Sequence, residues 1–266
     1  MASALTVWGL ARAFGGRVLL RIEDHDQTRS RPEFERAILE DLEWLGFHAD
    51  EPMTRQSDRG AKYEGALRGL EGRGLVYPCG CSRKIIETVL PSAAGETRYP
   101  GTCREALLDP ALHPARRVQL DPVSIAFHDL RLGPIEQIPA EQAGDLLARD
   151  RLGQWTYQFA VAVDDFDQGI DLVIRGEDLL SSAGRQIQLS QLLGRAVVPV
   201  FLHHPLITRA GGQKLSKSNQ DTGVRELRAA GWSRERLLGE AASALGLGEA
   251  AASTQAEIVA RIACLA

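Results

Sequence analysis

Short apolar runs that alternate with helix-patterned segments are the feature of this sequence that most restricts its fold. A helical pattern over residues 4–14 ends at Gly15-Gly16, and a mostly apolar run over residues 17–22 follows as a predicted strand. An apolar stripe at helical spacing then extends from Phe34 to Leu45 and ends at Gly46. A strand followed directly by a helix is the building unit of α/β folds with a parallel sheet.

The same alternation returns in the second half of the chain. We predict strands over residues 159–163, 171–174 and 198–203, and a helix over residues 183–193 between the last two strands. Strands that alternate with helices indicate a doubly wound, Rossmann-like parallel sheet. The expected fold class is therefore α/β.

Changes in composition divide the chain into four expected parts. Residues 1–74 would form the first part of a nucleotide-binding core, and residues 75–121, rich in Cys, Gly and Pro punctuation, would form an insertion. Residues 122–219 would complete the insertion and the core, and residues 220–266 would form a short helical C-terminal region. With 44% hydrophobic residues, the chain can bury a substantial core.

Charge and apolar patterning limit the class of function. A net charge of -4 and an isoelectric point of about 5.9 argue against nonspecific clamping of nucleic acid, so any RNA contact must be a local basic patch. The sequence contains neither an apolar run long enough to span a membrane nor a secretory signal at its start. We expect a cytoplasmic protein with no membrane or DNA among its partners.

Three of the four cysteines, Cys79, Cys81 and Cys103, lie close together in the expected insertion. In a reducing compartment such a cluster suggests a metal before a disulfide. With the phenol of Tyr99 the thiolates could close a four-ligand structural zinc site, which would stabilise an insertion too small for its own core. Because tyrosine is an unusual zinc ligand, a three-cysteine site completed by water, by His113 or by nothing is the alternative.

A polar loop after Gly211-Gly212 is the clearest candidate for phosphate binding. Its two lysines lie three residues apart with a hydroxyl between them, so the loop could neutralise charge that develops on a polyphosphate when its α-phosphate is attacked. A solvated basic turn is the alternative. The segment consists of Lys214, Leu215, Ser216, Lys217 and Ser218.

Charged side chains also follow two of the predicted strands. Glu23 lies at the carboxyl end of the strand over residues 17–22, in the crevice where open α/β sheets bind ligands, and could hold an ammonium group. Capping of backbone amides is the alternative. Arg175 leaves the strand over residues 171–174, where its planar fork could bind a carboxylate. The nearby acidic residues are predicted to be helix caps or ion-pair partners: Asp164, Asp165, Glu177 and Asp178.

Taken together, these segments resemble the class I aminoacyl-tRNA synthetases of the glutamyl group, and among them the glutamyl-Q tRNA(Asp) synthetases. The resemblance extends from residue 1 to about residue 219. It implies that Lys214 and Lys217 belong to the KMSKS loop that acts on the ATP phosphates. It also implies that Glu23 binds the amino group of L-glutamate and that Tyr157 and Arg175 bind the same amino acid. The zinc ligands of this subgroup would correspond to Cys79, Cys81, Tyr99 and Cys103.

The resemblance implies a two-step reaction. L-Glutamate and ATP, together with Mg²⁺, would form glutamyl-adenylate without tRNA, and the glutamyl group would pass to the queuosine base in the anticodon of tRNA(Asp). The expected cofactor is one structural Zn²⁺ per chain, and the expected oligomeric state is a monomer. Little sequence follows the KMSKS-like loop, so we expect no anticodon-binding domain. The alternatives are a truncated enzyme that charges tRNA acceptor ends, or a zinc module that binds nucleotide or tRNA with impaired catalysis.

Members of this family begin with a strand, a loop that carries an Arg and a Ser, and a His-x-Gly-His-like motif at a helix start. Residues 1–5 match the helix after that motif, so we expect the 266 residues as given to lack a central strand and a phosphate-binding helix terminus. Poor activation of glutamate is then expected in a pyrophosphate-exchange assay, with activity restored by an upstream extension. Full turnover from the 266 residues would contradict this expectation.

Overall fold

The computed structural model describes residues 1–26, 28, 30–89, 98–206, 223–247 and 257. The predicted phosphate loop, Lys214–Ser218, lies outside the described residues. The helices are α1 Ala2–Phe14, α2 Pro32–Leu45, α3 Gly60–Glu71, α4 Arg83–Val89, α5 Pro139–Gln142, α6 Tyr157–Asp167, α7 Ala183–Leu192, α8 Val224–Ala229 and α9 Arg234–Ala244, with 3-10 turns at η1 Gln56–Arg59 and η2 Glu177–Ser182. The strands are β1 Arg21–Ile22, β2 Thr54–Arg55, β3 Val76–Cys79, β4 Ala115–Val118, β5 Ile125–Asp129, β6 Gly133–Gln137, β7 Leu146–Arg149, β8 Leu172–Gly176 and β9 Val200–His204.

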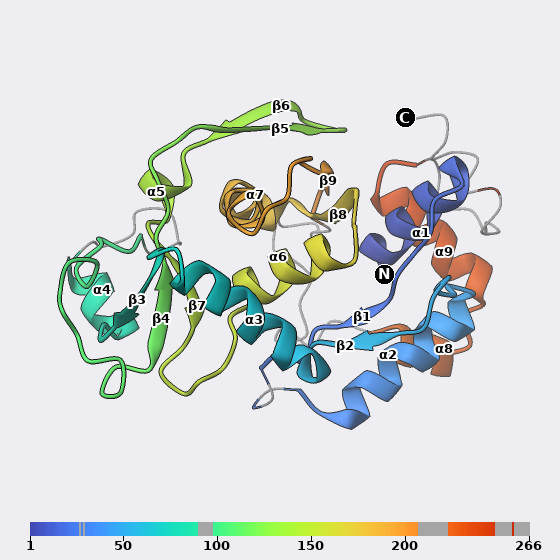
Figure 1. Ribbon diagram of the computed structural model, residues 1–266. Helices are drawn as coiled ribbons and strands as arrows, with labels where there is room; N and C mark the ends of the chain where they lie inside the picture. The colour runs from blue at the N-terminus through green and yellow to red at the C-terminus, as the bar shows by residue number, and fades with distance from the viewer. Residues whose placement is uncertain (27, 29, 90–97, 207–222, 248–256, 258–266) are drawn as a thin grey trace.

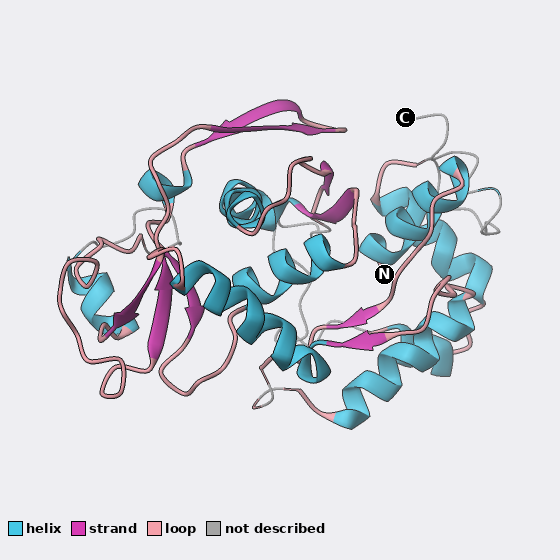
Figure 2. Ribbon diagram, viewed as in Figure 1, coloured by secondary structure: helices cyan, strands magenta, loops and turns pink. Residues whose placement is uncertain are grey.

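The described strands form three sheets, which Figure 2 shows in magenta. A two-stranded parallel sheet joins β1 to β2, and a four-stranded sheet has the order β6-β5-β9-β8. In the larger sheet, β9 pairs in parallel with both β5 and β8, whereas β5 and β6 form an antiparallel hairpin. The fold is therefore α/β with parallel pairs, as the sequence predicts. The third sheet, β3-β4-β7, is antiparallel throughout.

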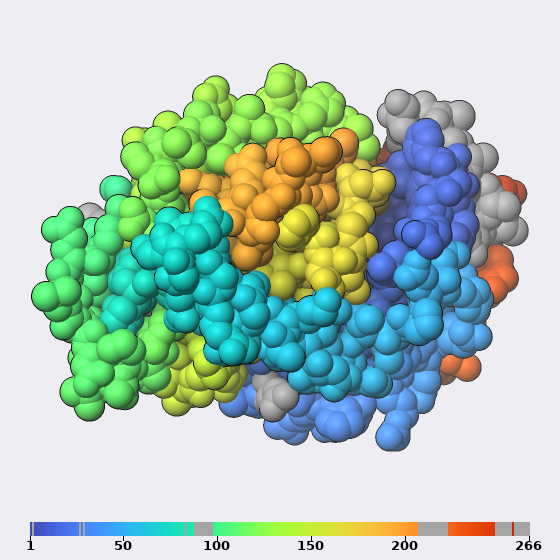
Figure 3. Space-filling model, in the orientation of Figure 1, coloured from blue at the N-terminus to red at the C-terminus, as the bar shows by residue number. Residues whose placement is uncertain are grey.

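The elements are arranged around α6, which lies between α3 and α7 (Figures 1 and 3). At one end of the molecule lies the β3-β4-β7 sheet with α4, and at the other end α1 packs against α9. Two hydrophobic clusters join helices from the first half of the sequence to helices from the second half. One joins α3 and the antiparallel sheet to α6 through Tyr63, Val118 and Phe159. The other joins α1 and α2 to α9 through Leu5, Leu45 and other apolar residues.

The first half of the chain largely follows the sequence pattern. Helices α1 and α2 end at the predicted residues and each begins two residues earlier than predicted. The glycines that follow them, Gly15 and Gly46, adopt left-handed conformations with φ of 66° and 79°. These conformations are easy for glycine and costly for other residues, which explains why both helices end there. The predicted strand over residues 17–22 pairs only at Arg21 and Ile22.

The strand predicted over residues 159–163 is wrong, because this segment is part of helix α6. The five residues from Phe159 to Val163 are all apolar and all buried, so this part of the helix has no polar side chain to mark an exposed face. A continuous apolar run of this length suits a buried strand and a buried helix equally well. The local signal for a helix is Thr156, whose hydroxyl accepts a hydrogen bond from the backbone N–H of Phe159 at the helix start.

Among the described helices, none combines the length and the apolar character needed to cross a bilayer.

A buried carboxylate fixes α6 against the first half of the chain. The side chain of Asp164 has no exposed surface and accepts hydrogen bonds from Gln56 Nε2 at 2.8 Å, Tyr63 Oη at 2.8 Å and Arg59 Nε at 2.6 Å. The Nε atom of Arg21 lies 3.6 Å from the same carboxylate. Four side chains, one from β1 and three from the continuous stretch of η1 and α3, therefore contact one buried anion.

We expect Asp164→Ala to lower the free energy of unfolding by about 3–5 kcal/mol, because it removes the buried acceptor of Gln56 and Tyr63 and one of the two carboxylates that pair with Arg59. Urea denaturation of the two proteins measures the difference. The control is Asp121→Ala at an exposed position, which should change stability by only about 0.5 kcal/mol. A loss of less than about 1 kcal/mol in Asp164→Ala, typical of an ordinary neutral hydrogen bond, would contradict the role of this network.

Candidate functional site

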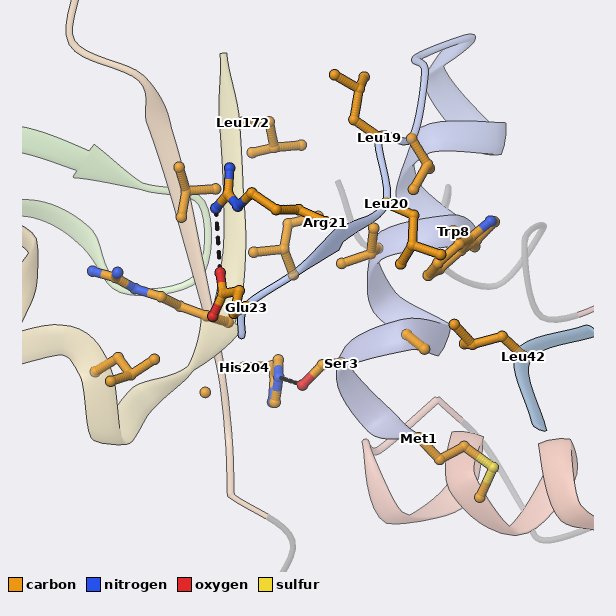
Figure 4. A pocket seen from close by; sticks show the side chains of 18 of the residues that line it. Met1, Ser3, Trp8, Leu19, Leu20, Arg21, Glu23, Leu42, Leu172 and His204 are labelled. Carbon is orange, nitrogen blue, oxygen red and sulfur yellow. Dashed lines mark hydrogen bonds and ion pairs between the residues drawn. The ribbon is translucent and has the colours of Figure 1, made fainter. Parts of the chain in front are cut away.

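A cavity of about 1060 Å³ separates α1 and the β1 segment from β8 and α6. All three predicted glutamate-binding residues line it together: Glu23, which follows β1, Tyr157, the first residue of α6, and Arg175 in β8. The cavity is largely apolar on the side of α1 and residues 18–20 (Figure 4). A hydrogen bond of 2.8 Å between Ser3 Oγ and His204 Nε2 links α1 to the end of β9 (Figure 4).

One side of the cavity carries an excess of negative charge. Arg21 points from β1 toward β8 and forms an ion pair with Glu23 at 3.3 Å, shown as a dashed line in Figure 4. The same guanidinium contacts Asp165 at 2.9 Å. Burial alone would lower the pKa of Arg21, but the charges of Asp165, Glu23 and Asp164 raise it, so Arg21 stays protonated. One cation thus faces two carboxylates that line the cavity, which leaves capacity to bind an ammonium group.

Asp165 is a lining residue that sequence reasoning treated only as an ion-pair partner. Asp165 does form an ion pair, with Arg21. The same prediction is confirmed for Asp164, which pairs with Arg59, and for Glu177, which pairs with Arg131. Burial raises the pKa of Asp165, and the charge of Arg21 opposes that shift. Its place in the cavity follows from the helix that replaces the predicted strand.

A buried cation also lines the cavity. Arg175 is only 8% exposed, and its Nε and Nη1 atoms donate hydrogen bonds to His203 and Gln186. Among the described atoms, Arg175 Nη2 is a buried donor without a hydrogen-bond partner. Burial lowers the pKa of Arg175, with the hydroxyl of Tyr157 and the charge of Asp165 opposing the shift. A buried donor of this kind has a strong requirement for an anionic acceptor.

Tyr157 lies between the two charged sides. Burial raises the pKa of its phenol, and the negative charge of Glu23 raises it further, so the hydroxyl stays protonated and can donate a hydrogen bond. Its ring lies 6.2 Å from the ring of His25, measured between centroids. The cavity therefore presents an anionic group, a neutral donor and a cation in sequence, an arrangement that suits a zwitterionic ligand.

A second candidate site lies beside the β3-β4-β7 sheet, at the end of the molecule away from α1 and α9 (Figure 1). The Sγ atoms of Cys79, Cys81 and Cys103 lie within 4.8 Å of one another, so the cluster could bind a metal. Tyr99 Oη is 3.7 Å from Cys79 Sγ and accepts a hydrogen bond from the Cys103 backbone N–H at 2.9 Å. His113 lies beside Gly80 instead, where its ring limits the space around the glycine.

The surroundings of the thiols affect their protonation. Burial raises the pKa of Cys81 to about 12, with the neighbouring thiols adding to the shift, so without a cation this thiol stays protonated. Arg117, which sequence reasoning missed, donates from Nε to Cys79 Sγ at 3.3 Å and stacks 3.6 Å from the centre of the Tyr99 ring. Its position across the β3–β4 pair, opposite Tyr77, brings it to the cluster.

A family model described as tRNA synthetases class I (E and Q), catalytic domain, matches residues 1–261. A glutamyl-Q tRNA(Asp) synthetase of Bordetella bronchiseptica is 44% identical over 261 residues, which cover 96% of this chain and 79% of that protein. The enzyme of the same name from Thiobacillus denitrificans is 40% identical over 252 residues, covering 94% of this chain and 82% of that protein.

Solved structures of similar fold include the glutamate-tRNA synthetase of Elizabethkingia anophelis, with a TM-score of 0.78 and 24% identity. A glutamate tRNA ligase of Elizabethkingia meningosepticum in complex with its amino acid gives a TM-score of 0.77, also at 24% identity. Each superposition covers 97% of this chain, but the chain spans only 61% and 60% of the length of those two proteins. The similarity concerns the fold.

We expect the purified chain to bind about one metal ion, held by the thiol cluster. Elemental analysis after gel filtration should show this metal lost in Cys79→Ser and in Cys103→Ser. Cys264→Ser is the matched control, because it removes a cysteine other than the three that the sequence predicts as ligands, and it should keep the metal. Equal metal content in all four proteins would show that the cluster is not the site.

Proposed function

The chain belongs to the class I (E and Q) tRNA synthetase family, as its motifs predict, and from this premise we propose that it activates L-glutamate with ATP and transfers the glutamyl group to the queuosine base in the anticodon of tRNA(Asp). The amino-acid and nucleotide chemistry follows from the family. The proposed tRNA follows from the relatives that carry the name glutamyl-Q tRNA(Asp) synthetase.

The observation that carries the proposal is the charge pattern of the cavity. Glu23, with Asp165 behind it, would bind the ammonium group of glutamate, and Arg175 would bind a carboxylate through its buried Nη2 donors. Tyr157 would donate a hydrogen bond between them. Opposite charges at separate positions in one cavity would orient a zwitterion in a single direction, which reduces the entropic cost of bringing its reacting carboxylate to ATP.

In the activation step, a carboxylate oxygen of glutamate attacks the α-phosphate of ATP, and pyrophosphate leaves with the electrons of the broken P–O bond. We propose that Lys214 and Lys217 neutralise the charge that develops on the phosphates, which is the electrostatic role such loops serve in phosphoryl chemistry. Mg²⁺ bound with ATP would share this charge. In the second step, a nucleophilic group of the queuosine base attacks the adenylate carbonyl and AMP leaves.

For the thiol cluster we propose a structural Zn²⁺ held by Cys79, Cys81, Cys103 and Tyr99. Three thiolates and a phenolate would complete four-coordinate binding with no open position, as structural zinc sites require. The arrangement of the donor atoms supports this set over one that includes His113. The metal would hold together the β3–β4 region, whose buried cluster contains only a few apolar residues.

Pyrophosphate exchange tests the activation step on the 266-residue chain and on a form extended from an upstream start codon. Exchange should depend on glutamate and proceed without tRNA. Labelled glutamate should then appear on tRNA(Asp) that carries queuosine, and periodate oxidation of the queuosine diol should prevent it. Labelling of the acceptor end of another tRNA would contradict the proposal and indicate an enzyme that charges tRNA acceptor ends. Nucleotide binding without exchange in both forms would indicate a binding module.

Arg175→Lys should raise the KM for glutamate about 10-fold to 100-fold, because lysine keeps the charge and loses the planar fork that binds a carboxylate. Arg151→Ala, a change at an exposed position, is the control and should leave the KM unchanged. Thermal melting of both variants shows whether they remain folded. A folded Arg175→Lys enzyme with the normal KM would contradict the assignment of Arg175.

A further inference from the structure

Three strand ends of the larger sheet bring together a chain of buried polar side chains. Asp129 ends β5, His203 lies in β9 and Arg175 lies in β8, and β9 is the strand between the other two. His203 is the direct register partner of Arg175 across the β8–β9 pair. Asp129 and His203 have no exposed surface, and Arg175 is 8% exposed. The three side chains thus form a line across the sheet that ends at the cavity.

The hydrogen bonds along this line have a defined direction. Arg175 Nε can only donate, so His203 Nε2, 3.0 Å away, must be the unprotonated acceptor. His203 therefore carries its proton on Nδ1, which donates to Asp129 Oδ2 at 2.7 Å. Asp129 is itself held by backbone N–H groups: those of Arg131 and Leu132 donate to Oδ1, and that of His203 donates to Oδ2.

The charge states agree with this direction. Burial alone would raise the pKa of Asp129, but its hydrogen bonds from His203 and the backbone lower it, so the group is a carboxylate. Burial lowers the pKa of His203, and the nearby guanidinium of Arg175 lowers it further, against the effect of Asp129. The imidazole is therefore neutral, as an acceptor for Arg175 must be.

Arg175 is held from a second direction as well. Its Nη1 donates to Gln186 Oε1, Gln186 Nε2 donates to Gln158 Oε1 at 2.7 Å, and Gln158 Nε2 donates to Ser182 Oγ at 3.0 Å. Two of the three guanidinium nitrogens are thereby fixed to β9 and α7. The third, Nη2, is the donor that has no partner among the described atoms.

We propose that Asp129 and His203 are positioning residues that fix Arg175, so that its Nη2 group is presented to a carboxylate of the substrate in the cavity. This inference rests on the proposed binding of glutamate. Asp129 and His203 do not line the cavity themselves. Asp129 sets the tautomer of the His203 imidazole, in the way that a carboxylate orients a histidine in other sites. The imidazole in turn sets the plane of the Arg175 guanidinium.

Two substitutions of His203 separate this role from general packing. His203→Gln can place an amide oxygen near the position of Nε2 and keep an acceptor for Arg175. His203→Asn is shorter, keeps a donor toward Asp129 and removes that acceptor. We expect His203→Asn to raise the KM for glutamate about 10-fold, with kcat and the KM for ATP changed much less, and His203→Gln to restore most of the loss. Equal effects of both variants on kcat and on each KM would overturn the proposal.

Asp129→Asn tests the tautomer. An amide nitrogen facing His203 would favour a proton on Nε2, which conflicts with Arg175, so the KM for glutamate should rise as in His203→Asn. His128→Asn, at an exposed position in the same strand, is the control and should behave as the unchanged chain. A normal KM for glutamate in folded Asp129→Asn would overturn the role of Asp129.

Nitrogen NMR of histidine-labelled chain tests the arrangement without any substrate. The His203 signals, assigned with His203→Gln, should show a protonated Nδ1 and an unprotonated Nε2 at neutral pH. An Nε2-protonated ring or an imidazolium would overturn the relay even if glutamate is activated. Conversely, the expected tautomer in a chain that neither binds nor activates glutamate would reject the proposed function and, with it, the assignment of the relay to glutamate.

Discussion

The buried charge of Asp164 is the constraint on which the arrangement of this molecule depends. A carboxylate without exposed surface requires compensation, and it receives it from groups in β1, η1 and α3. Those contacts fix the direction of α6. Helix α6 in turn carries Tyr157 and Asp165 to the cavity, so the electrostatics of one internal residue determine where two lining residues lie.

The parts of the fold that local chemistry decides were predictable from sequence. Helix ends at Gly15 and Gly46 require a left-handed conformation, and the sequence shows both glycines directly. Helix α6 was not predictable in this way, because the apolar run from Phe159 to Val163 is buried throughout and does not distinguish a helix from a strand. Family membership was predicted from motifs and is confirmed, whereas the role of the Lys214–Ser218 segment stays a prediction.

The residues of the candidate sites also differ in whether local sequence could predict them. Glu23 and Arg175 follow strands, a position that can be recognised from sequence, whereas Tyr157 was reached only through the family resemblance. The thiols lie close in sequence, but Arg117 reaches Cys79 only through the pairing of β3 with β4. Asp129 and His203 are 74 residues apart and carry no local pattern that connects them. Sequence separation, more than residue type, decided what could be foreseen.

The long reach of the Asp164 contacts has a consequence for how the chain matures during synthesis. Tyr63 and Arg59 lie 101 and 105 residues before Asp164, so their buried partner has not yet left the ribosome when they emerge. Leu67 and Leu70 also await apolar partners from Val118 onward. The segment up to α3 therefore cannot acquire its stable packing alone. Cooperative collapse waits for α6, and chaperones would find exposed apolar surface during that interval.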